Sequence, residues 1–232
     1  MASLAATGHR IELRSDVPGL VPFRFSKDGN RLAATRGPDI LRTWNVESGQ
    51  IVASINQNFS DACFAANGRV LVVAIFRRIR SEIEFYNLAR PDLVPRRVPG
   101  GFDVQRLAVS PNGELVAAGS LGGQVLLFDA AIGELIDTFY GHVTGTLGIA
   151  FSPDGRRLFS AMNGQEAVKL WDVGTRQELL TLVGADQGLR NARWSADGDV
   201  ILAGPPWQVW VAPSWEEIEE VEANEKTEFK QP

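Results

Sequence analysis

The chain has 232 residues, of which 44% are hydrophobic and 22% are charged, as is typical of a globular domain with a substantial core. Its single cysteine, Cys63, excludes an internal disulfide and a thiolate metal cluster. The longest apolar run, 70–76, is too short to cross a bilayer, and the first ten residues lack the features of a secretory signal. The sequence therefore predicts a cytoplasmic protein without a membrane span.

The net charge of −5 is concentrated at the C-terminus. Residues 213–232 contain seven glutamates and two lysines, so the charges in the rest of the chain balance to zero. Overall charge therefore argues neither for nor against nucleic acid as a partner.

One motif occurs five times along the chain. It begins with an apolar or aromatic residue that ends a strand, continues with a small residue, and closes with Asp-Gly or Asn-Gly. The copies are 25–29, 64–68, 109–113, 151–155 and 194–198, and their glycines are 39, 45, 42 and 43 residues apart. This is the chemistry of a short hairpin turn, in which the glycine takes the left-handed conformation.

A second motif follows each glycine by about fifteen residues. It is an aromatic residue, usually followed by Asn or Asp, at positions 44–45, 86–87, 128–129, 171–172 and, in degenerate form, 210–211. The flanking segments alternate with the period of two that is typical of strands. In the fourth copy the predicted strands are 147–151, 157–161, 167–171 and 178–183.

Four short strands in a period of 40 to 45 residues are typical of a propeller blade. The sequence resembles the WD40-repeat β-propeller family over about residues 10–212, and the fourth copy resembles it most. That copy has Gly141-His142, the 151–155 turn, Ser160 and Leu170-Trp171-Asp172 in the family's order. The resemblance implies structural roles for His142, Ser160, Trp171 and Asp172, and for Trp44 in the first copy. The turn 163–166 lacks the aspartate that completes the family's hydrogen-bond network.

The repeats divide residues 1–212 into units of roughly 10–49, 50–93, 94–133, 134–177 and 178–212. The fold class expected is therefore all-β, a propeller of about five four-stranded blades. Residues 5–13 align with the loop and outer strand that finish a blade, so the chain starts within a repeat and ends after a third strand. Two alternatives stay open: the first strand closes a five-blade ring, or the chain is a partial arc that lacks upstream blades of the same or a second chain.

Residues 213–232 predict a short acidic helix and tail. Ser214 is a suitable N-cap, and Glu217 three residues later completes a capping box. This ending resembles the C-terminal portion of bacterial WD-repeat proteins.

The sequence offers little for catalysis. Its two histidines are far apart and have no metal-ligand or triad spacing, and Cys63 lies within a predicted inner strand. The polar residues expected near the inner strand ends, Asp61, Asp103 and Arg190, form no repeated constellation. We therefore expect no catalytic residue, no cofactor and no metal.

Outside the C-terminal tail, one region of the chain has an excess of positive charge. Arg77, Arg78 and Arg80 fall in the connection between the second and third strands of the second copy. This connection is an ordinary solvated loop or the contact site for an acidic protein partner; nucleic acid is disfavoured, because no aromatic residues alternate with the arginines. The sequence favours a non-catalytic protein–protein interaction scaffold. The alternatives are a small-molecule sensor or enzyme that uses the central channel, and a regulatory fragment of a larger signalling protein.

Overall fold

The structure is a computed structural model, and it describes residues 13–212 except 79, 144, 163–167, 185–188, 190–192 and 205–206. The helix expected within 213–232 and most of the strand expected at 5–13 lie outside the described residues. Within the described residues, no helix is long and apolar enough to pass through a membrane.

In the described residues, nineteen strands form five antiparallel sheets, each from strands consecutive in the chain. The first sheet has the strands β1 (Val21–Phe25), β2 (Arg31–Arg36), β3 (Ile40–Asn45) and β4 (Ile51–Asn56). The second has β5 (Phe59–Ala65), β6 (Val70–Arg77), β7 (Arg80–Asn87) and β8 (Arg96–Pro99), with a short 3-10 turn, η1 (Ala66–Gly68), after β5. The third has β9 (Val104–Val109), β10 (Leu115–Ser120), β11 (Val125–Asp129) and β12 (Leu135–Phe139).

The fourth sheet has β13 (Thr146–Phe151), β14 (Arg157–Met162), β15 (Val168–Asp172) and β16 (Glu178–Leu182). The fifth has three strands in the described residues, β17 (Arg193–Trp194), β18 (Val200–Ala203) and β19 (Gln208–Val211). The strands of the fourth sheet agree with the sequence prediction to within one residue. The all-β class and the four-stranded units are therefore confirmed.

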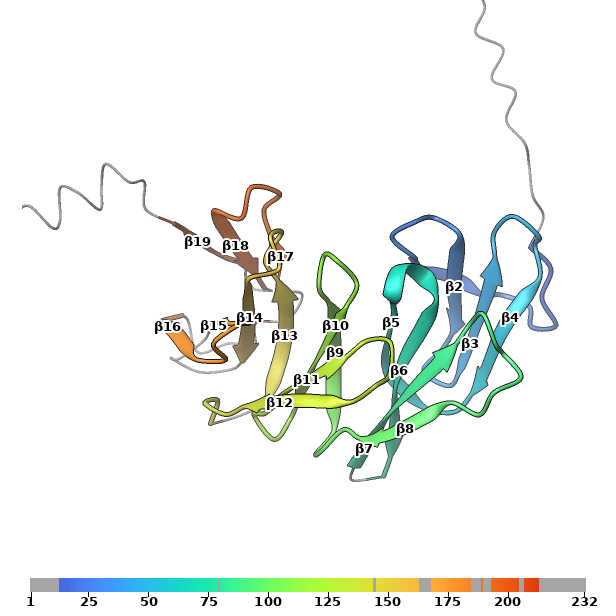
Figure 1. Ribbon diagram of the computed structural model, residues 1–232, viewed down its shortest axis with the longest axis horizontal. Helices are drawn as coiled ribbons and strands as arrows, with labels where there is room; N and C mark the ends of the chain where they lie inside the picture. Colours follow the sequence, from blue (N-terminus) through green and yellow to red (C-terminus); the bar gives the residue numbers. More distant parts are fainter. Residues whose placement is uncertain are drawn as a thin grey trace, which may run out of the picture.

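The five sheets follow one another along an open arc, with the first and last sheets at its two ends (Figure 1). The second to fifth sheets meet through their first strands, since β5 contacts β9, β9 contacts β13 and β13 contacts β17. These first strands line the inner side of the arc. The described sheets do not close into a ring, and the N-terminal strand expected to close one falls mainly on residues 1–12, outside the described part.

Four apolar clusters hold the arc together, one at each junction between neighbouring sheets. At three of the junctions an aromatic pair crosses the boundary, with ring centroids 5.3–5.9 Å apart: Phe85–Phe128, Phe139–Trp171 and Phe159–Trp194. Each sheet therefore buries its faces against its neighbours, as in other repeat proteins whose stability is a sum of such interfaces.

The Asp-Gly and Asn-Gly turns share one hydrogen-bond pattern in four of the five repeats. The serine hydroxyl donates to the Asp or Asn side chain two residues later, over 2.5–2.6 Å, and accepts from the backbone N–H five residues later, at 2.9 Å. All five glycines have φ between +73° and +87°, as the turn motif predicted. The second repeat has Ala65 in place of the serine, and there the chain forms η1 with positive φ at Ala66 and Asn67.

Candidate functional site

The loops of the arc lie at two opposite edges. At one edge the five hairpin turns contact one another in chain order, for example through the Ala66 N–H donating to the Gly113 carbonyl at 2.8 Å. We call this edge the turn face. At the other edge lie the β6–β7 turn and the connections between sheets, and we call it the connection face.

The connection face is tied together by backbone hydrogen bonds between its loops. The connection 100–103 exchanges bonds with Ser81, where the Ser81 N–H donates to the Gly101 carbonyl at 3.1 Å. The Leu121 N–H in the β10–β11 turn donates to the Asp103 carbonyl at 2.9 Å. The loops of the second and third sheets are therefore held against one another on this face.

Large apolar side chains are exposed along the connection face. They come from three connections between sheets and from the β18–β19 turn, and their exposed fractions lie between 51% and 86%: Phe102, Tyr140, Val143, Val183 and Trp207. Three of the five are aromatic. Aromatic residues and arginine are the types enriched in the buried cores of protein interfaces.

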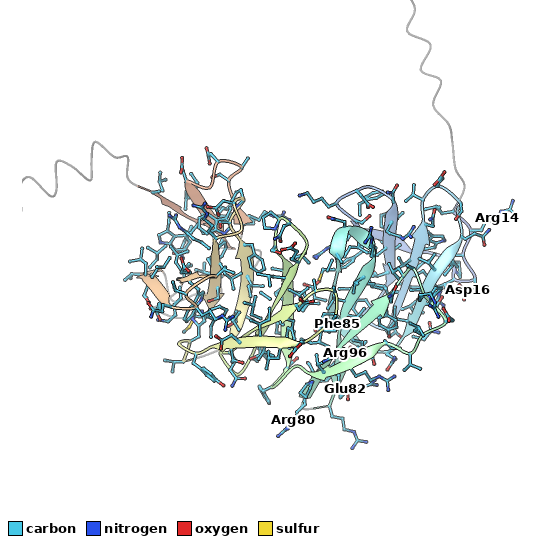
Figure 2. All side chains as sticks on the ribbon, in the orientation of Figure 1. Arg14, Asp16, Arg80, Glu82, Phe85 and Arg96 are labelled. Carbon is cyan, nitrogen blue, oxygen red and sulfur yellow. The ribbon has the colours of Figure 1, made fainter. Side chains whose placement is uncertain are left out.

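The structure separates the three arginines that the sequence singled out. Arg77, at the end of β6, forms ion pairs with Glu82 at 3.1 Å and with Glu84 at 3.4 Å. Arg78 is exposed in the turn with φ +60°, and Arg80 projects away from the sheet at the lower edge of Figure 2. Neither Arg78 nor Arg80 forms an ion pair within the described residues. These two arginines therefore supply free positive charge on the connection face, whereas Arg77 is engaged by the sheet.

The buried carboxylate of Glu84 is one of the groups that hold Arg77 in place. Its side chain is fully buried, and it accepts hydrogen bonds from Arg97 at 2.9 Å, from Arg77 and from the Tyr86 hydroxyl. A buried carboxylate is stable only with such partners. The structure thus places Arg77 at the end of β6 and Arg80 at the start of β7, so of these three arginines Arg78 lies in the turn itself, and Arg77 is exposed but held by ion pairs.

His142, in the connection between β12 and β13, lies beside Ser160 of β14 and Trp171 of β15. The Trp171 indole N–H donates to Ser160 Oγ at 2.8 Å, and His142 Nε2 lies 2.5 Å from the same oxygen. Which group donates in the His142–Ser160 hydrogen bond depends on the histidine tautomer. Nδ1 is buried and has no partner among the described residues, and the turn 163–166, which lacks the family's aspartate, lies outside them.

Burial lowers the pKa of His142 to about 4, with the nearby Lys169 ammonium adding to the effect and Glu178 opposing it. A depressed histidine pKa gives stability that is complete above the unfolded value of about 6.5 and is lost as the pH falls toward 4. Lowering the pH from about 7 to about 5 should therefore reduce the free energy of unfolding by about 2 kcal/mol. Urea titrations over this range measure the loss. His142→Gln should flatten the pH dependence, and an unchanged slope in that variant would contradict the assignment.

Trp44 and Asp172 have positions that explain their motif. Trp44 is 3% exposed, and its indole N–H donates to the Arg14 carbonyl at 2.9 Å, which fastens the segment before β1 to the first sheet. Asp172 accepts the Thr175 N–H at 2.7 Å and so orders the turn after β15. The equivalent Asn45, Asn87 and Asp129 accept backbone N–H groups in the same way. In the first four copies the second motif is therefore a turn cap next to a buried or half-buried aromatic residue.

The structure contains a cavity on the inner side of the arc that the sequence did not reveal. This cavity has a volume of about 370 Å³ and is lined by the first strand of every sheet. Four ionisable side chains reach it: Arg24, Asp61, Arg106 and Arg193. Of the scattered residues noted in the sequence, Asp61 lies here, Asp103 lies on the connection face, and Arg190 lies outside the described residues.

The described residues show no group of three or more His, Cys, Asp or Glu side chains arranged to hold a metal ion. Cys63 is 2% exposed, and burial raises the pKa of its thiol to about 12. Since the thiolate is the reactive form, this cysteine is an inert core residue.

Comparison with known proteins identifies the repeats. The family model described as WD domain, G-beta repeat matches residues 96–129 and 133–172. These segments contain most of the strands of the third and fourth sheets.

Curated relatives match over longer stretches. WD repeat-containing protein SL1-17 of Schistosoma mansoni is 25% identical over 72% of this chain and 52% of its own length. An uncharacterized WD repeat-containing protein of Synechocystis is 30% identical over 67% of this chain and 45% of its own. The small ribosomal subunit protein RACK1 of Glycine max is 37% identical over 44% of this chain and 36% of its own. The chain spans about half or less of the length of these relatives. Together with the all-β architecture of stacked sheets, these matches show that the chain contains WD40 repeats.

Proposed function

We propose that the chain is a non-catalytic scaffold that binds a protein partner through its connection face. The observation that carries this proposal is the row of exposed apolar side chains, from Phe102 to Trp207, on loops that join the strands of successive sheets. An apolar, partly aromatic surface of this kind loses its contact with water on association. Because the loops are held by rigid sheets, little conformational entropy is lost when they bind.

The positive charge on the connection face favours a partner whose binding surface has acidic side chains beside its apolar contact. Arg78 and Arg80 are exposed and have no ion pair within the described residues. Exposed charges at the rim of an interface act mainly on the rate of encounter and on its salt dependence. Relatives named as small ribosomal subunit proteins belong to a large assembly, which supports a binding role for this chain as well.

Two exposed valines provide a matched test. Val143 on the connection face is 86% exposed. Val94 is 81% exposed and lies in the β7–β8 loop, 88–95, at the opposite end of β7 and therefore on the turn face. A photo-activated cross-linker placed at position 143 of the full chain should capture one partner in cells of the source organism, and the same cross-linker at position 94 should not. The double variant Arg78→Glu/Arg80→Glu should reduce the captured amount at low salt. Equal capture from both positions, or capture at 94 alone, would refute the proposal.

The remaining expectations are part of this proposal. A cytoplasmic location and a bacterial source are expected from the sequence, and the cyanobacterial relative is compatible with them. Further blades supplied by the same or a second chain would complete the arc seen in Figure 1. The buried state of His142 and Cys63 supports the non-catalytic reading.

A further inference from the structure

The cavity on the inner side of the arc is formed by residues from all five sheets. Its volume is about 370 Å³, within the range of roughly 300–1,000 Å³ that is usual for small-molecule sites. Besides the ionisable residues, the lining includes Ser60 and Gly148. The absence of a side chain at Gly148 leaves space beside its strand. A cavity of this size accommodates a small molecule or a single side chain but not a folded segment.

The charged side chains in the cavity are mostly cationic. Arg24 from β1, Arg106 from β9 and Arg193 from β17 stand against one carboxylate, Asp61 from β5. Arg24 lies 3.6 Å from Asp61 and is partly neutralised by it. Arg106 donates one N–H to the Gln105 carbonyl, and neither Arg106 nor Arg193 forms an ion pair with a carboxylate in the described residues. Two guanidinium groups therefore have donors available for a ligand.

Asp61 has a structural role that accounts for its presence among arginines. It is 6% exposed and accepts the Leu107 N–H of the neighbouring sheet and the Ala62 N–H, both at 2.9 Å. Burial raises the pKa of this carboxyl group, and the charges of Arg24 and Arg106 oppose that effect. Asp61 thus joins the first three sheets along the inner strands, and its oxygens are already occupied by these donors.

We propose that this cavity binds a small multivalent oxyanion, a phosphate ester or a polycarboxylate, between Arg106, Arg193 and Arg24. Guanidinium groups match the planar oxygen pairs of phosphate and carboxylate, and charge-assisted hydrogen bonds of this kind are stronger than neutral ones. The three arginines come from the two ends and the middle of the arc, so a bound anion joins the first, third and fifth sheets. This site is separate from the connection face and stands independently of the proposed partner.

Calorimetric titration of the full chain with pyrophosphate, and in parallel with citrate, tests the site. The wild type should bind at least one of them, and the preferred anion distinguishes phosphate from carboxylate ligands. The double variant Arg106→Gln/Arg193→Gln should weaken binding by at least about tenfold, because each lost charge-assisted bond contributes substantially to affinity. Asp61→Asn should strengthen binding, since it removes the one negative charge while keeping an oxygen that accepts from Leu107.

A matched control uses two exposed arginines of the turn face. Arg69→Gln/Arg156→Gln removes the same charge as the cavity variant but lies outside the cavity. It should bind the anion within about twofold of the wild type, since exposed charges interact weakly at moderate salt. Circular dichroism of each variant without ligand establishes that it is folded. Absence of binding to the wild type, or equal weakening in the control and cavity variants, would overturn the proposal.

Discussion

Removing both Arg77 and Arg97 should lower the free energy of unfolding by about 3–5 kcal/mol, the usual effect of leaving a buried charge unpaired. Glu84 is fully buried, and these two arginines are its cationic partners among the described residues. Urea denaturation of Arg77→Ala/Arg97→Ala measures the loss. Adding Glu84→Gln to the double variant should recover most of it, because the uncharged side chain no longer needs a cation.

The matched control for this experiment is Arg78→Ala/Arg80→Ala. It removes the same charge from the same sheet, but both side chains are exposed and unpaired within the described residues. Its stability should stay within about 0.5 kcal/mol of the wild type, as at ordinary surface sites. Equal losses in the two double variants would show that Glu84 is not the source of the effect.

Trp171→Ala should lower the free energy of unfolding by about 3–5 kcal/mol, as for other large aromatic residues removed from a core. Its side chain is 3% exposed, it packs on Phe139 of the third sheet, and it donates to Ser160. The substitution therefore creates a cavity at the junction of two sheets and leaves a buried hydroxyl without a donor. Chemical denaturation followed by circular dichroism measures the change.

Trp171→Phe separates packing from hydrogen bonding at this position. Phenylalanine keeps much of the contact with Phe139 but loses the indole N–H, so about 1–2 kcal/mol should be lost. A loss below about 1 kcal/mol in Trp171→Ala would contradict the view that junctions between sheets supply the stability of the arc.

The fold could be predicted from the sequence because its turns are specified locally. The serine, the Asp or Asn and the glycine of each hairpin bond within six residues, so the sequence contains all the participants. The second repeat shows the limit of that argument. The motif predicted the same turn there, but Ala65 has no hydroxyl to accept the backbone N–H, and the chain forms η1 instead.

The cavity was harder to predict, because its residues come from different repeats. A signal was nevertheless present: Arg24 and Arg193 each stand five positions before a turn glycine, and Asp61 and Arg106 each stand seven positions before one. Offsets that differ by two lie on the same side of a strand. The burial of Glu84 beside Arg77 gave no such signal, since it depends on how the second sheet packs against its neighbours.

The central claim is that the connection face binds the partner. The most direct test uses the partner that cross-linking identifies, purified on its own. Its affinity is measured for Val143→Asp and for Val94→Asp, because the two exposed valines differ mainly in the face that carries them. A charge buried in an interface without a partner should weaken binding by at least about tenfold for Val143→Asp. Val94→Asp should bind as the wild type does. Undiminished binding by Val143→Asp, or an equal loss in both variants, would contradict the claim.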